Sequence, residues 1–186
     1  MFRIEMSNTL VDELSCDLLM VPFYQGQRPP RGDAGWIDWR LYGRLSQWLL
    51  DGKVVDDSFE SILLTSEGKL QSPWILLVGL GEDKKIPPLQ GKSWIARILK
   101  IGMRLRVESL AISLSFAQQI HLPVQEIGEG IVEALQESQS LPLSLKNRRL
   151  VLVGHPTLLK AVSSSLDLLR SAYPMDAEVA QSQGLS

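Results

Sequence analysis

The sequence predicts an α/β domain with three αβα layers, in which helices cover both faces of a mixed central sheet. Segments with the apolar spacing of helices alternate along the chain with short apolar segments typical of strands. Two neighbouring strand segments are joined by a short turn, which predicts one antiparallel pair in an otherwise parallel sheet. The chain has 186 residues, 45% of them hydrophobic, and is therefore long enough to bury one core without disulfides.

Six segments carry strand patterns: residues 2–6, 18–21, 59–64, 74–78, 110–114 and 149–153. The first alternates apolar and polar side chains, as a half-buried strand does. The second is uniformly apolar, so we expect a central strand covered on both faces. The third and fourth flank the turn-forming sequence Ser66-Glu67-Gly68-Lys69, which predicts a hairpin.

Four segments place apolar residues three and four positions apart, which predicts four amphipathic helices. Their apolar positions are Ile37, Leu41, Leu45, Trp48 and Leu49; Ile95, Ile98, Leu99, Gly102 and Leu105; Val124, Ile127, Ile131, Val132 and Leu135; and Leu158, Leu159, Val162, Leu166 and Leu169. We expect the first helix to run unbroken from Trp36 to a stop at Gly52.

Two segments without periodicity complete the prediction. Residues 25–35 concentrate Gly, Pro, Arg and Asp, so we expect a loop. The polar tail after Pro174 has no apolar stripe. We therefore expect a single domain over residues 1–173 and a flexible tail over residues 174–186.

Composition limits the function. The formal charge is −2, from 19 basic and 21 acidic residues, which argues against nucleic acid as a partner. The sequence has no signal-peptide pattern and no long uncharged apolar run, so we expect a cytoplasmic protein that does not cross a membrane. One cysteine, Cys16, and two histidines cannot build a zinc cage, and we expect no metal and no cofactor.

The stretches Cys16-Asp17-Leu18-Leu19-Met20-Val21-Pro22 and Ile75-Leu76-Leu77-Val78-Gly79-Leu80-Gly81 resemble the N-terminal domain of leucyl aminopeptidases, the M17 peptidases. The resemblance extends over about residues 1–172 in element order and implies a macro-domain-like fold. In that family a catalytic domain with two metal ions follows. Its signature, Asn-Thr-Asp-Ala-Glu-Gly-Arg-Leu, does not occur in this sequence, so the resemblance does not imply aminopeptidase activity.

Macro domains bind ADP-ribose, and the resemblance therefore implies a nucleotide as the alternative ligand. In that family an acidic residue near the first core strand reads the adenine, and Asp17 stands in the matching place. The structural alternative is that Asp17 accepts hydrogen bonds from backbone amides at the strand entrance. The second glycine loop of the family has no counterpart, because Ser113-Leu114-Ser115-Phe116 contains no glycine to admit a pyrophosphate.

Three further residues follow predicted strands. Gly79 and Gly81 resemble the start of a dinucleotide fingerprint, but Lys84 stands where its third glycine belongs, and a tight turn explains both glycines without a ligand. His155 lies where the last strand leads into a helix, at an edge where α/β proteins bind ligands. Its alternative role is that of a polar turn residue.

One loop and the helix after it combine basic and aromatic side chains, which suit a protein partner or single-stranded nucleic acid. The residues are Arg28, Arg31, Arg40, Trp36, Trp39, Tyr42 and Trp48. Alternatively, Trp36 and Trp48 belong to the core. Our preferred interpretation is a non-catalytic binding, assembly or regulatory domain that joins a protein partner or a second copy of itself.

Overall fold

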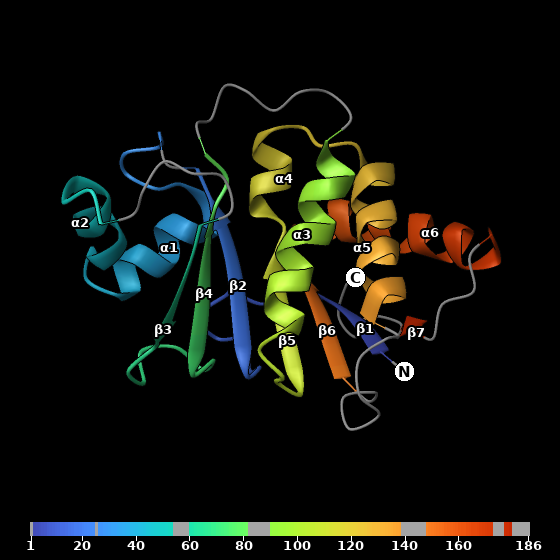
Figure 1. Ribbon diagram of the computed structural model, residues 1–186, viewed down its shortest axis with the longest axis horizontal. Coiled ribbons are helices and arrows are strands. Elements are labelled where there is room, and N and C mark those ends of the chain that lie inside the picture. Colours follow the sequence, from blue (N-terminus) through green and yellow to red (C-terminus); the bar gives the residue numbers. More distant parts are fainter. Residues whose placement is uncertain are drawn as a thin grey trace.

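The protein forms a seven-stranded mixed sheet with helices on both faces (Figure 1). The computed structural model describes residues 2–24, 26–53, 60–81, 90–138, 148–172 and 177–179. The order of strands across the sheet is β3 (Ser61–Thr65), β4 (Trp74–Gly79), β2 (Leu18–Phe23), β5 (Ser109–Ser113), β6 (Arg148–Val153), β1 (Phe2–Ser7) and β7 (Ala177–Val179). Among the strands of the described ranges, only β3 is antiparallel to its neighbour, so the predicted hairpin and the mixed sheet are confirmed.

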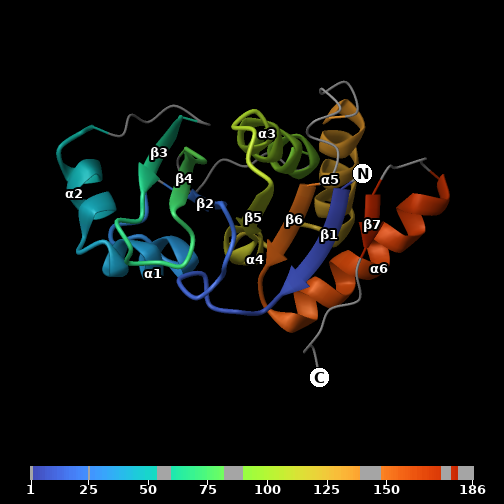
Figure 2. The same ribbon diagram turned by 90° about the horizontal axis from the view of Figure 1, so that it is seen from below.

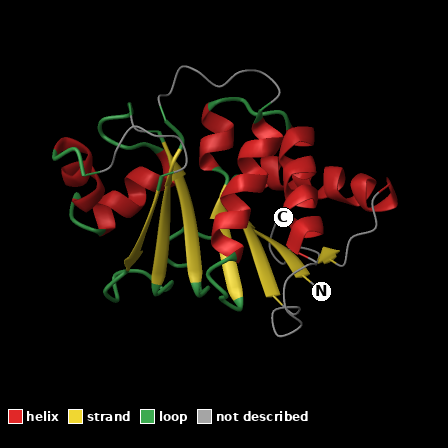
Figure 3. Ribbon diagram, viewed as in Figure 1, coloured by secondary structure: helices red, strands yellow, loops and turns green. Residues whose placement is uncertain are grey.

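The helices divide between the two faces of the sheet. They are α1 (Gly32–Arg40), α2 (Arg44–Leu50), α3 (Gly91–Met103), α4 (Ser115–Gln119), α5 (Val124–Ser138) and α6 (Pro156–Ala172). Figure 2 shows α1 and α3 on opposite sides of the sheet, and Figure 3 distinguishes the helices from the strands by colour. No helix in the described ranges is long and apolar enough to cross a membrane.

The central strand β2 explains the uniformly apolar run of the sequence. All six of its residues are buried. Leu18 and Met20 join the core cluster under α3, α5 and α6, whereas Leu19 and Val21 join the cluster under α1 and α2. Both faces of this strand are thus covered, as the apolar run predicts.

The first predicted helix is not continuous. It divides into α1 and α2 because Tyr42 and Gly43 adopt left-handed backbone conformations, with φ of 58° and 75°. Leu41 and Leu45 remain buried in the same cluster on either side of the break. The spacing of the apolar residues continues across the turn, which is why this spacing alone predicted one helix. The preceding loop is also shorter than expected, since α1 begins at Gly32.

Two short elements were not predicted. Helix α4 has only five residues, too few for a periodic signal. Strand β7 lies in the tail that we expected to be loose, where it pairs in parallel with β1. The three residues of β7 form backbone hydrogen bonds with β1, which is distant in sequence, so no local sequence pattern predicts this strand. The domain boundary at residue 173 remains a prediction, and Phe59, Lys84 and Pro174 lie outside the described residues.

Candidate functional site

The four candidate residues lie on two opposite edges of the sheet. Strands β2, β4 and β6 are parallel, so one edge holds their first residues and the other, which we call the carboxyl edge, holds their last. Asp17 immediately precedes β2, whereas Gly79 ends β4 and His155 follows β6. The structure therefore does not bring Asp17 together with the other three candidates.

Asp17 joins the starts of β2 and β5. Its Oδ2 accepts hydrogen bonds from the backbone N–H of Ser109 at 2.8 Å and of Glu108 at 3.1 Å, and from the Ser109 hydroxyl at 3.0 Å. Its own N–H donates to the Ser109 carbonyl at 3.2 Å. These are the contacts of the structural alternative, because a carboxylate oxygen with three donors is held by the fold itself.

The glycines and the histidine serve local structure at the carboxyl edge. The N–H of Gly79 donates to the Glu60 carbonyl at 2.8 Å and joins the two strands at the open end of the hairpin, and Gly81 has a φ of 77° that favours glycine. The exposed His155 accepts a hydrogen bond at Nδ1 from the N–H of Thr157, 3.3 Å away. This bond caps the first turn of α6. A ligand role for these residues remains a prediction.

A partly buried polar cluster occupies the carboxyl edge between β2 and β5, and the sequence did not reveal it. The hydroxyl of Ser113 donates to Asp33 Oδ2 at 2.6 Å and lies 2.9 Å from the hydroxyl of Ser115. The N–H of Asp33 donates to the Ser115 hydroxyl at 3.3 Å. The chain leaves β2 towards β4 but leaves β5 towards β6, so this cluster lies at the switch point where α/β sheets bind ligands.

The electrostatics of this cluster do not suit an anion. Burial raises the pKa of Asp33, and the hydrogen bonds from Ser113 and Ser115 oppose that rise. A Cβ at Gly32 would lie 2.5 Å from Nε2 of Gln119, the end of an exposed side chain. The site thus presents a carboxylate, which would repel an anion such as a phosphate. Within the described ranges, no three side chains of His, Cys, Asp or Glu gather closely enough to hold a metal ion.

The basic and aromatic side chains form a second candidate site on the surface. A hollow of about 300 Å³, which we call the aromatic hollow, is lined by Trp39, Arg40, Tyr42, Gly68 and Lys69. It lies between the end of α1 and the turn joining β3 to β4. The side chain of Trp39 is 63% exposed and that of Tyr42 is 84% exposed. Large aromatic groups at that exposure are typical of binding surfaces.

Buried and paired charges hold the rings of the aromatic hollow in place. The buried Asp12 accepts a hydrogen bond from Nε1 of Trp36 at 2.8 Å and forms an ion pair with Nε of Arg40 at 3.2 Å. Trp36 in turn lies against Trp39, with 5.1 Å between ring centroids. Trp36 is 41% exposed, so the expectation that it belongs to the core is wrong, whereas Trp48 does pack against the core.

The turn side of the aromatic hollow is equally ordered. Nζ of Lys69 lies 4.7 Å from the centroid of the Tyr42 ring, within the range of a cation–π contact. Glu67 forms ion pairs with Arg44 and Lys69, which lower its pKa to about 2. The exposed Arg28 and Arg31 do not line the hollow. Of the three arginines considered from the sequence, only Arg40 reaches it.

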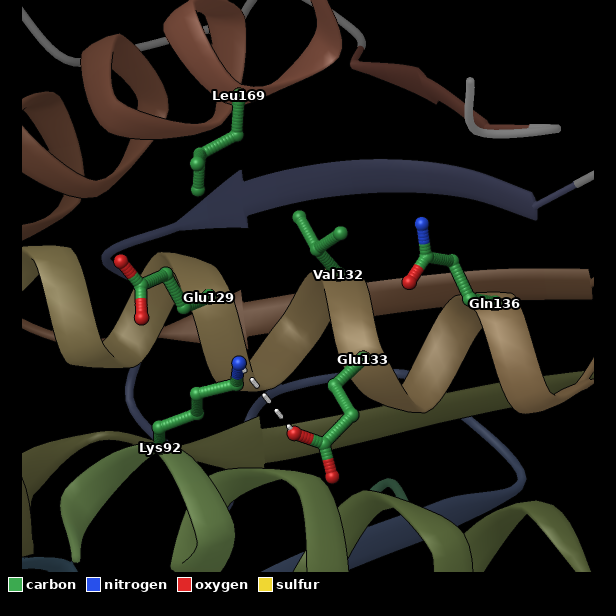
Figure 4. Close-up of a pocket in the computed structure, with 6 residues that line it drawn as sticks. All are labelled: Lys92, Glu129, Val132, Glu133, Gln136 and Leu169. Carbon is green, nitrogen blue, oxygen red and sulfur yellow. Dashed lines mark ion pairs between the residues drawn. The ribbon is translucent and has the colours of Figure 1, made fainter. Parts of the chain in front are cut away.

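A further hollow lies between α3, α5 and α6, lined by Lys92, Glu129, Val132, Glu133, Gln136 and Leu169 (Figure 4). Figure 4 shows Lys92 reaching towards Glu133, and the two form an ion pair at 3.7 Å. Lys100 also pairs with Glu133, at 3.1 Å. No aromatic side chain of the described residues lines this hollow, so it offers a ligand less apolar surface than the aromatic hollow does.

Comparison with known proteins identifies the family. Residues 20–141, more than half of the chain, match the model of the cytosol aminopeptidase family, N-terminal domain. The chain belongs to this family. The resemblance stated from the sequence is thereby confirmed. None of the curated proteins matches the chain by sequence.

Solved structures share the fold of this cytosol aminopeptidase N-terminal domain. A mutant macrodomain from Oceanobacillus iheyensis aligns with a TM-score of 0.70 at 13% identity, covering 91% of this chain and 93% of its own. A Trypanosoma brucei macrodomain in complex with ADP-ribose gives 0.63 at 14% identity, covering 87% and 68%. A mutant tomato leucine aminopeptidase gives 0.59 at 14% identity. The alignment covers 89% of this chain and only 35% of the tomato enzyme.

Proposed function

We propose that this domain is a non-catalytic binding module that docks a protein partner through the aromatic hollow. The observation that carries the proposal is the exposure of two large rings, Trp39 and Tyr42, that the structure nevertheless holds in place. Exposed apolar surface gains about 25 cal/mol per Å² when a partner covers it. Rings that are already ordered lose little conformational entropy in doing so.

The backbone at Tyr42 supports the same conclusion. A left-handed conformation at a residue other than glycine costs about 1 kcal/mol, and Tyr42 adopts it while its ring projects into solvent. The ring itself adds nothing to the core, since it is the most exposed large apolar side chain described. Strain of this kind is typical of functional surfaces.

The charges around the aromatic hollow indicate the chemistry of the partner. Arg40, Arg44 and Lys69 outnumber Asp12 and Glu67 by one positive charge. The fitting partner segment therefore carries an apolar or proline side chain for the rings and a carboxylate for Lys69. Single-stranded nucleic acid fits less well, because Glu67 would repel the phosphate backbone.

Binding of ADP-ribose is the alternative, supported by the fold shared with the macrodomain that was solved in complex with it. Against it stands the carboxylate of Asp33 at the switch point. A calorimetric titration with ADP-ribose separates the two functions. Saturable heat would favour the alternative, and its loss in His155→Ala or in Asp17→Ala would show which of these two predicted residues contacts the ligand.

Family membership suggests a first partner, a full-length leucine aminopeptidase from the same organism. We expect biolayer interferometry to detect binding to the wild-type domain, and a loss of at least tenfold with Trp39→Ser or Tyr42→Ser. Leu168→Ser is the matched control, because Leu168 is 74% exposed on α6, away from the hollow. Equal binding by all variants would contradict the role of the hollow, and no binding by any would contradict this choice of partner.

A further inference from the structure

The two outer strands of the sheet differ in how well they are protected from pairing with a strand of another chain. Strand β3 ends the sheet on one side and pairs only with β4 within the described ranges. Its sequence, Ser-Ile-Leu-Leu-Thr, contains no charge, proline or glycine, the residues with which proteins usually protect such edges. At the other side, β7 has only three residues, and the middle one is Glu178.

The register of the hairpin shows which backbone groups of β3 face outward. The N–H of Gly79 donates to the Glu60 carbonyl, and the N–H of Ser66 donates to the Pro73 carbonyl. Hydrogen-bonded pairs alternate along an antiparallel ladder, so Ile62 and Leu64, which lie between these two pairs, also bond to β4. The N–H and C=O groups of Ser61, Leu63 and Thr65 therefore point away from the sheet.

We propose that β3 pairs in antiparallel fashion with β3 of a second copy of this chain, around a twofold axis that passes between the two Leu63 residues. In that register Leu63 lies opposite Leu63, and Ser61 lies opposite Thr65 of the other copy. All three are hydrogen-bonded pairs, because the outward groups belong to these same residues. The strand is thus complementary to itself, as a twofold interface requires.

The side chains and the charge of β3 are compatible with pairing to a second copy of this strand. Leu63 is 45% exposed and lies on the same face of the sheet as the exposed Trp74, which is paired with Thr65. Pairing places the two Leu63 side chains in contact and reduces the exposed apolar surface area beside Trp74. A strand without charged residues meets its own copy without repulsion between like charges. The sheets of two copies then form one continuous sheet.

Sedimentation velocity over a concentration series tests the self-association. We expect the wild type to form a dimer as concentration rises, and Leu63→Lys to remain a monomer because two lysines would meet at the axis. Leu168→Lys is the matched control, since it changes an exposed leucine on α6 and should leave the dimer unchanged. Wild-type protein that stays monomeric up to its solubility limit, or a dimer that persists in Leu63→Lys, would overturn the proposal.

A backbone variant distinguishes strand pairing from contact between side chains alone. Ser61→Pro removes an outward N–H at the first residue of an edge strand, a position where proline is tolerated. We expect it to weaken the dimer while the melting temperature of the monomer stays near that of the wild type. A dimer of unchanged strength in Ser61→Pro would show that the strands do not pair.

Disulfide trapping tests the register. Opposed residues of a hydrogen-bonded pair have Cα atoms about 5.5 Å apart, within reach of a disulfide. We therefore expect Leu63→Cys to form a linked dimer on mild oxidation, with Leu168→Cys as the control for random collision, while the native Cys16 is buried. Equal rates in both variants would reject the register. Tyr42→Ser should leave this dimer intact, so the proposal stands or falls independently of the aromatic hollow.

Discussion

At the carboxyl edge of the sheet, polar side chains form hydrogen bonds with one another. At the aromatic hollow, polar and charged side chains instead support aromatic rings that are exposed to solvent. Ser113, Ser115 and Asp33 form a closed set of hydrogen bonds between β5 and α1. Around the hollow, Asp12 and Glu67 pair with basic residues, and the rings of Trp39 and Tyr42 remain uncovered. The polar groups of the first surface have their partners within the chain, while the second leaves apolar area exposed to solvent.

Asp12→Ala should have the largest effect, because it removes the support of the aromatic hollow. Arg40 would lose its ion pair and Trp36 its acceptor, both at a buried carboxylate. We expect the free energy of unfolding to fall by about 3 kcal/mol. Urea denaturation followed by tryptophan fluorescence measures the loss. Asp12→Asn keeps an acceptor for Trp36 and should lose less; an equal loss would show that the charge is irrelevant.

Ser113→Ala tests whether the hydrogen bonds among Asp33, Ser113 and Ser115 at the carboxyl edge stabilise the fold. The Ser113 hydroxyl is fully buried and donates to a carboxylate, so its removal should cost about 2 kcal/mol. Ser115→Ala, at a partly buried position, should cost less. Chemical denaturation of both variants gives the comparison. The cluster would be shown not to stabilise the fold if Ser113→Ala were as stable as the wild type.

Alanine substitutions at two glycines with left-handed backbone conformations compare the packing at the carboxyl edge with the packing beside the aromatic hollow. Gly32 at the carboxyl edge has a φ of 60° and Gly43 beside the aromatic hollow a φ of 75°. An alanine at either should cost about 1 kcal/mol in backbone strain. Only at Gly32 would the new Cβ also meet Gln119, since the space around Gly43 is open. Thermal melts should therefore show the larger loss for Gly32→Ala; equal losses would mean that Gln119 moves aside without cost.

The smallest expected effect is a difference in pH dependence between two carboxylates. Burial raises the pKa of Asp33 from 3.8, so its contribution to stability is present below pH 3.8 and is lost as pH rises through the raised value. The partners of Glu67 lower its pKa from 4.5 to about 2, so its contribution is present above pH 4.5 and is lost as pH falls towards 2.

Asp33→Asn and Glu67→Gln should therefore change the slope of stability against pH in opposite directions. The change for Glu67→Gln should be small, since its ion pairs are exposed to solvent. Urea titrations of the two variants and the wild type across this acidic range measure both slopes. Slopes that change in the same direction would contradict the assigned environments.

The strands and most of the helices were predictable because their apolar spacing is local. The stripe through Ile95 and Ile98 became α3, and the run at Leu18 became the buried strand β2. The break at Tyr42 was hidden because Leu41 and Leu45 keep their spacing on both sides of it. The arrangement of the candidate site residues was not predictable, because Asp17 and His155 lie at opposite edges of the sheet. The contacts of Asp17 with Glu108 and Ser109 are those of its structural alternative, and a ligand role for either residue remains a prediction.

The sequence by itself determined the fold class and the chemical character of the loop and helix around Trp39, since periodicity and composition are properties of neighbouring residues. It also indicated the family, through the resemblance of two short stretches to known members. Only the tertiary structure decided which distant residues meet. It placed Asp12 under Trp36 and Arg40, joined Ser113 to Asp33, and left the outer groups of Leu63 facing away from β4. Each of these depends on the order of strands in the sheet and on contacts between elements far apart in the chain, which no local pattern records.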